Sequence, residues 1–145
     1  MARVLALDLG SKRIGVASSD TTRTLASPVV VLLRRGAAAE DHKAIADIVD
    51  EYEADTIVVG LPLSLNGSEG KAAKLIRTEF VQLQALFEPK GISVVVHDER
   101  FTTTTAHANL KERNLNAAKR RNIVDKVAAA VLLQSWLDGE KGRNL

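Results

Sequence analysis

Apolar residues in the first third of the chain fall into three short runs separated by polar turns. Residues 4–9 and 14–17 flank the polar segment 10–13, and this pattern predicts a β-hairpin. A third apolar run at 25–33 follows a second turn and predicts a third antiparallel strand. Because this run contains Pro28, which has no amide hydrogen to donate, we expect it at an edge of the sheet.

Helical spacing and short apolar runs alternate in the rest of the chain. The expected elements are a helix at 40–53, a strand at 56–59, a helix at 69–87, a strand at 92–96, and helices at 104–113 and 121–137. Both strands are wholly apolar, which is typical of parallel strands covered on both faces. The last helix is apolar on all sides between 127 and 133, so we expect it to be buried.

This order of elements predicts an α/β fold with a mixed five-stranded sheet. Three antiparallel strands are followed by two parallel strands, and the connecting helices should cover both faces. Helical spacing in the segment 69–87 predicts five inward side chains, which are Leu75, Ile76, Phe80, Leu83 and Phe87. We expect one domain over residues 1–138 and a flexible, charged tail at 139–145.

Composition narrows the classes of function. The chain has 145 residues, of which 46% are hydrophobic and 3% aromatic, so base stacking on aromatic rings cannot be its main way of binding nucleic acid. The absence of cysteine excludes disulfides and thiolate zinc sites, and agrees with a cytoplasmic location. The apolar run at the N-terminus is too short for a signal peptide, and no run approaches the length of a membrane span.

Positive charge is concentrated near the last predicted helix. The formal net charge is only +2, but residues 111–126 include six basic and two acidic side chains. The cluster Lys119, Arg120 and Arg121 lies just before Asp125 and could steer a phosphate backbone toward that end of the helix.

Asp8 is a carboxylate within an apolar strand. Period-two alternation places it on the same face as Val4 and Ala6. An ionised carboxylate there costs several kcal/mol unless a cation or hydrogen bonds compensate it. It could cap the turn at Gly10, pair with a basic residue of that turn, or belong to a metal or phosphate site, and the strand pattern does not distinguish these roles.

Two further acids occupy positions that a fold alone would not require. Glu99, beside Asp98, follows a buried strand at its carboxyl end, where ligand crevices of open α/β sheets lie. Asp125 is early in the last helix, on its apolar stripe. Taken singly, Glu99 could form an ion pair with Arg100 or be solvated, and Asp125 could stabilise the N-terminal end of the helix through the helix dipole. Together with Asp8 they would repel one another unless cations lay between them.

The ligand chemistry of such a cluster indicates Mg²⁺ or Mn²⁺, because the acids supply hard oxygen ligands without His or Cys. A pair of these ions about 3.5–4 Å apart is suited to hydrolysis of a phosphodiester. The histidines show no metal-ligand spacing. We expect His42 and His107 on helix surfaces, and His97 as a hydrogen-bonded structural residue.

Four segments together resemble the YqgF (RuvX) family. They are DLGSKRIGVA at 8–17, VGLP at 59–62 with glycines at 67 and 70 downstream, DERFTT at 98–103, and VDKVAA at 124–129. The likeness extends from residue 3 to residue 137, and Phe101 stands where the family often has Leu. The resemblance implies an RNase H-like fold and a nuclease in which Asp8, Glu99 and Asp125 are the metal-binding catalytic acids.

The same resemblance implies two substrates. The family is associated with resolution of Holliday junctions, by analogy with RuvC, and with maturation of the 5′ end of the small-subunit ribosomal RNA precursor. Branched DNA or structured RNA is therefore the expected partner, and a junction resolvase should be a homodimer because two symmetric cuts need two sites. Candidate contacts to the nucleic acid are Lys12, Arg13, Arg100, Thr102, Lys119, Arg120 and Arg121.

Two other functions fit parts of the chain. The segment 8–11 also resembles the first phosphate loop of the superfamily of actin, heat-shock ATPases and sugar kinases, but those proteins hold ATP between two such domains and this chain has room for one. A non-catalytic module for nucleic-acid binding or ribosome assembly would need only the basic segment, and the acids would then be structural.

Overall fold

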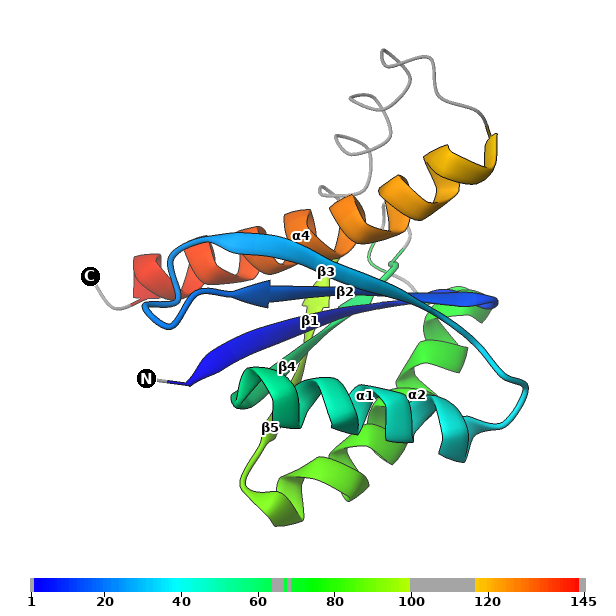
Figure 1. Ribbon diagram of the computed structural model, residues 1–145, viewed down its shortest axis with the longest axis horizontal. Helices are drawn as coiled ribbons and strands as arrows, with labels where there is room; N and C mark the ends of the chain where they lie inside the picture. Colours follow the sequence, from blue (N-terminus) through cyan, green and yellow to red (C-terminus); the bar gives the residue numbers. More distant parts are fainter. Residues whose placement is uncertain (1, 64–66, 68, 100–116, 144–145) are drawn as a thin grey trace.

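The structure is a computed structural model that describes residues 2–63, 67, 69–99 and 117–143, with only the backbone described at 117–124 and 141–143. Its elements are β1 (Arg3–Leu9), β2 (Arg13–Ser19), β3 (Ala26–Leu33), α1 (Ala38–Tyr52), β4 (Ala54–Leu61), α2 (Lys71–Phe87), a 3₁₀ turn (Glu88–Lys90), β5 (Ser93–Asp98) and α4 (Ala117–Arg143) (Figure 1). The helix expected at 104–113 lies outside the described residues.

The five strands form one mixed sheet, as the order of elements predicts. The strand order is β3-β2-β1-β4-β5, with antiparallel pairing among the first three strands in the chain and parallel pairing of β4 to β1 and to β5. The strand β3 is at an edge, and Pro28 lies opposite Ala17 beside a shift of register. The edge position and the local irregularity accommodate the missing donor.

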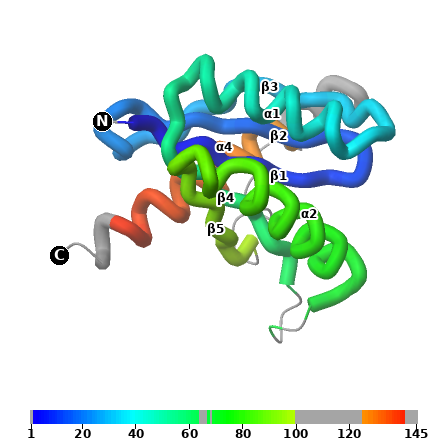
Figure 2. The backbone as a smooth tube through the Cα atoms, turned by 90° about the horizontal axis from the view of Figure 1, so that it is seen from below, coloured from blue at the N-terminus to red at the C-terminus, as the bar shows by residue number. Residues whose placement is uncertain are grey.

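Helices cover both faces of the sheet. In Figure 1, α4 lies above the sheet, and α1 and α2 lie below it; Figure 2 shows α1 and α2 in front of the strands. Alternation along β1 divides the core accordingly. Leu5 and Leu7 pack in the cluster that includes residues of α1 and α2, whereas Val4 and Ala6 pack against α4 through Leu132 and its neighbours. Asp8 therefore belongs to the face that α4 covers.

The prediction that Leu75 faces inward is wrong. Leu75 is 65% exposed, because the buried residues Ala73, Ile76 and Leu83 turn a neighbouring side of α2 toward the sheet. The last helix begins at Ala117 and continues through Arg143, so it includes residues 139–143 of the expected tail. Each of the two glycines in that stretch costs a helix only about 1 kcal/mol.

The long helix α4 is buried on one side, whereas its apolar sequence between 127 and 133 predicts burial all round. Ala128, Ala129, Leu132 and Leu133 are buried, but Val131 is partly exposed. Within the described part of the chain, α4 contacts the sheet along one stripe of its surface. None of the helices in the described part of the chain combines the length and the apolar character needed to cross a bilayer.

Candidate active site at the carboxyl ends of β1, β4 and β5

Asp8 lies near the carboxyl end of the central strand, with a glycine beside it on each neighbouring strand. It pairs with Gly15 of β2. On the other side, Leu7 pairs with Val59 of β4, so the parallel register brings Gly60 next to Asp8. Because glycine has no side chain, other groups can approach the sheet closely on both sides of the carboxylate.

The side chain of Glu99 fills the space above Gly60. A Cβ atom at residue 60 would lie 2.3 Å from Oε1 of Glu99 and 2.5 Å from its Cδ. The main-chain N–H of Glu99 donates to the carbonyl of Leu61 at 3.1 Å, which fixes the residue just beyond β5. Glu99 therefore extends over β4 toward β1, and its side chain is hydrogen-bonded to that of Asp8.

The contact with Asp8 changes the chemistry of Glu99. Burial, the negative charge of Asp8, the hydrogen bond between the two side chains and the charge of Asp98 together raise the pKa of Glu99 to about 8. Glu99 is only 9% exposed. Two carboxyl groups in contact are stable when a proton or a cation lies between them, so this pair is suited to binding a divalent ion.

Helix α4 crosses the sheet at the second glycine. A Cβ atom at Gly15 would lie 2.2 Å from the carbonyl oxygen of Asp125, so the helix backbone rests directly on β2 beside Asp8. The side chain of Asp125 accepts a hydrogen bond from Nε of Arg13 at 2.8 Å, and both side chains are about one-quarter exposed. Arg13 is thus an ion-pair partner of Asp125 in this structure.

The structure brings the three acids to the same end of the central strands, but only two of them are in contact. Asp8 and Glu99 are in contact, while Asp125 lies above the adjacent strand and is turned to Arg13. Over the described ranges, no group of three His, Asp or Glu side chains is assembled as a metal site. The turn at Gly10 is closed by main-chain groups, because the amide of Gly10 donates to the carbonyl oxygen of Asp8 at 3.1 Å.

The predicted nucleic-acid contacts are only partly described. Lys12 is exposed on the turn between β1 and β2, beside Arg13. Lys119, Arg120 and Arg121 belong to the first two turns of α4, where the backbone alone is described. Arg100 and Thr102 lie outside the described residues.

Sequence reasoning missed the two glycines and a polar network. Gly15 and Gly60 interrupt apolar strands, which is a signal for close approach of another group. The prediction that His42 lies on the surface is wrong, since it is 8% exposed and its Nε2 lies 2.9 Å from Oε2 of Glu79. The expectation for His97 is confirmed, since its Nε2 lies 2.9 Å from the hydroxyl of Ser135 on α4.

A family model and the sequences of related proteins agree with each other. The family model described as RuvX, Holliday junction resolvase, matches residues 2–139. A relative from Rhodococcus opacus is 44% identical over 146 residues, which cover 99% of this chain and 80% of the relative. One from Fusobacterium nucleatum is 41% identical over 142 residues, covering 97% of this chain and all of the relative. Both relatives carry the name "Putative pre-16S rRNA nuclease".

Solved structures with a similar fold come from resolvases. Thermus thermophilus RuvC in complex with a Holliday junction substrate superposes with a TM-score of 0.62 at 12% identity, covering 98% of this chain and 97% of that one. The Holliday junction resolvase of fowlpox virus gives a TM-score of 0.58 at 11% identity, with coverages of 95% and 99%. At this identity the likeness concerns the fold, and it confirms the expected RNase H-like class.

Proposed function

The chain belongs to the RuvX family of Holliday junction resolvases and pre-16S rRNA nucleases, and from this premise we propose that its nuclease activity depends on Mg²⁺ or Mn²⁺ held by Asp8, Glu99 and Asp125. The observation that carries the proposal is the contact between the carboxyl groups of Asp8 and Glu99 at the carboxyl ends of the strands. Placing two acids in contact away from solvent costs a fold stability, whereas a cation site requires that arrangement.

The donor set fits a hard divalent ion. All three candidate ligands are carboxylates, and Glu99 gives up its proton more easily when a cation replaces it between the two acids. When bound, a pair of such ions would neutralise charge on the phosphate and supply an activated water for hydrolysis. Asp8, Glu99 and Asp125 would hold these ions, with Asp8 as the central acid of the three.

Basic residues of the chain would hold the nucleic acid. Arg13 and Lys12 are on the turn that follows Asp8, so a phosphate at the acids would lie within their reach. The cluster Lys119, Arg120 and Arg121 precedes Asp125 by four to six residues on the same helix. Arg100 and Thr102 directly follow Glu99 in the chain. Each neutralised phosphate adds to binding and makes it salt-dependent.

Structured RNA is the substrate that the relatives favour. Proteins that are 41–44% identical over nearly the whole chain are named for the precursor of 16S rRNA, so we propose that this protein processes its 5′ end. Branched DNA is the second candidate, because the fold neighbour RuvC was solved with a Holliday junction. Resolution of a junction would require a homodimer, since each protomer makes one of two cuts.

A cleavage assay tests the proposal. The wild-type protein and the Asp8→Asn variant are incubated with a precursor RNA and a four-way DNA junction, with Mg²⁺, Mn²⁺ or EDTA. We expect cleavage of the RNA by the wild type with either metal, and none with EDTA or by the folded variant. Equal cleavage by Asp8→Asn would overturn the role of the acids. ATP turnover without nucleic acid would support the phosphotransfer alternative, and retained biological activity of Asp8→Asn would support a binding module.

A further inference from the structure

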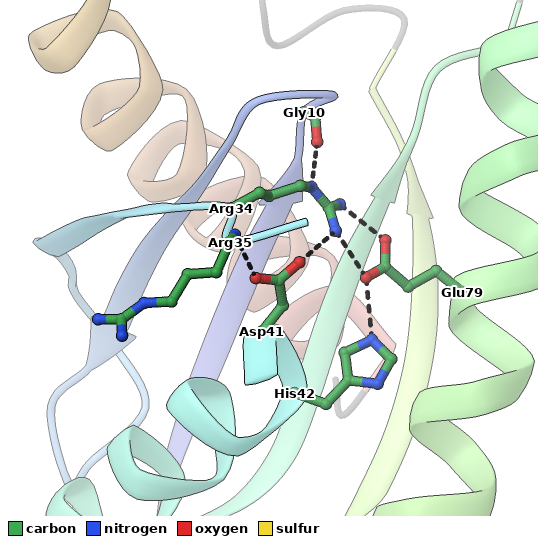
Figure 3. A network of polar contacts seen from close by, with 6 residues as sticks. All are labelled: Gly10, Arg34, Arg35, Asp41, His42 and Glu79. Carbon is green, nitrogen blue, oxygen red and sulfur yellow. Dashed lines mark hydrogen bonds and ion pairs between the residues drawn. The ribbon is translucent and has the colours of Figure 1, made fainter. Parts of the chain in front are cut away.

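Arg34, the first residue after β3, joins the turn beside the acids to the helices on the other face of the sheet (Figure 3). Its Nε donates to the carbonyl of Gly10 at 2.7 Å, and its main-chain N–H donates to the carbonyl of Lys12 at 2.9 Å. Its Nη1 and Nη2 donate to the two carboxylate oxygens of Glu79 at 3.0 and 2.7 Å, and Nη1 also lies 3.4 Å from Oδ2 of Asp41. The group Arg34, Asp41, His42 and Glu79 is called the Arg34 clamp below.

The clamp holds a turn whose two ends lead to the candidate active site. The amide of Gly10 donates to the carbonyl oxygens of Asp8 and of Arg13, at 3.1 and 2.9 Å. Arg34 binds the carbonyls of Gly10 and Lys12, so it fixes the turn at alternate peptide groups. One end of the turn continues into Asp8 and the other into Arg13, the ion-pair partner of Asp125.

The clamp is built to be rigid. Asp41 is 6% exposed, and the side chains of Glu79 and Arg34 are 13% and 20% exposed. Although burial opposes ionisation, hydrogen bonds from Arg34 and His42 hold the pKa of Glu79 below its usual range. Burying such charges is a costly way to stabilise a fold, since apolar residues of similar volume usually serve as well. A fully hydrogen-bonded network does, however, fix one geometry.

From these contacts we propose that Arg34 is a positioning residue of the active site, which keeps the turn at residues 10–13 in the one conformation that aligns Asp8 and Arg13. The inference rests on the proposed function, because it assigns the turn a role in that chemistry. Arg34 itself lies on the far side of the turn and contacts neither Glu99 nor Asp125 among the interactions of the described residues.

The chain offers a matched control at the other end of β1. Arg23 also donates Nε to a main-chain carbonyl, that of Ala2 at 2.9 Å, and pairs through Nη2 with a carboxylate, that of Asp55. Its side chain is 28% exposed. Arg34→Lys and Arg23→Lys therefore remove the same kind of contact from opposite ends of one strand, and each keeps the positive charge.

Four measurements on both variants test the proposal: unfolding temperature, hydrogen exchange of the Gly10 amide, kcat and KM for RNA cleavage with Mn²⁺, and Mn²⁺ affinity. Both variants should lose stability. Only Arg34→Lys should speed exchange at Gly10, by about tenfold or more, and lower kcat by about 10- to 100-fold with KM changed little. Mn²⁺ affinity from calorimetry, which does not depend on turnover, should fall in Arg34→Lys and not in Arg23→Lys.

The possible results distinguish failure of the positioning role from failure of the proposed function. A folded Arg34→Lys protein with wild-type kcat, or with wild-type exchange at Gly10, would overturn the positioning role. A wild-type protein that neither cleaves nor binds Mn²⁺ would instead overturn the proposed function. If Arg34→Lys does not fold, Glu79→Gln weakens the same clamp more mildly, and wild-type kcat in that variant would equally overturn the inference.

Discussion

Replacing Glu99 with Gln should make the metal-free protein more stable, and increasingly so as the pH rises. In the wild type the pKa of Glu99 is raised from 4.5 to about 8 by burial and by Asp8. The folded protein therefore retains a proton that the unfolded chain releases, and the free energy of unfolding falls between these two pH values. Gln is neutral at every pH and can donate its amide N–H to Asp8, so the variant lacks this loss.

The size of the effect follows from the shift in pKa. Each unit corresponds to about 1.4 kcal/mol, so raising the pKa of Glu99 from 4.5 to about 8 costs up to about 5 kcal/mol once the pH exceeds 8. Near pH 7 the expected difference is about 3 kcal/mol, and near pH 4.5 it approaches zero. The advantage of Glu99→Gln over the wild type should rise across this window and level off above it.

Urea unfolding between pH 4 and 9 in the presence of EDTA measures this difference. Glu51→Gln, an exposed carboxylate late in α1, is the control and should follow the wild type. Adding Mn²⁺ at pH 8 to about 100 times its Kd should restore about 3 kcal/mol to the wild type and much less to Glu99→Gln. Parallel pH profiles for the wild type and Glu99→Gln would refute the reasoning that Glu99 is held against Asp8.

The structure makes three further predictions. Gly60→Ala should fold but displace the flexible side chain of Glu99 from Asp8, and so lower the Mn²⁺ affinity measured by calorimetry by about tenfold or more. Gly70→Ala is the control and should keep the wild-type affinity, because a Cβ atom at residue 70 meets no atom within 4 Å. Gly15→Ala should destabilise the protein in urea by about 1–3 kcal/mol or more, because its Cβ meets the backbone of α4; an unchanged midpoint would contradict that packing. Arg13→Gln should bind RNA more weakly and with a shallower salt dependence, by about one unit of slope, and an unchanged slope would argue against a phosphate contact by Arg13.

The fold was predictable because its local patterns agree with one another. Alternation in β1 correctly placed Asp8 on the face of Ala6, opposite Leu7, and the prolyl residue in β3 correctly indicated an edge strand. The order of strands and helices then allowed few topologies. The exposed position of Leu75 was missed because helical periodicity identifies an apolar stripe but does not fix its edges.

The site was less predictable, because it depends on contacts between distant parts of the chain. The pair of Arg13 with Asp125 spans 112 positions, and nothing in the local sequence links them. The contact of Glu99 with Asp8 depends on β4 lying between β1 and β5, with glycine at the position between the acids. The Arg34 clamp joins a turn and two helices through long side chains, whose partners only the folded arrangement reveals.

The most direct test of the central claim is X-ray diffraction from crystals of the protein soaked in Mn²⁺, with anomalous scattering used to locate the ions. The account predicts Mn²⁺ bound to the carboxylates of Asp8 and Glu99, with Asp125 completing the site, and loss of that signal in Asp8→Asn. Mn²⁺ located elsewhere, or no bound Mn²⁺ at millimolar concentration in well-ordered crystals, would contradict it.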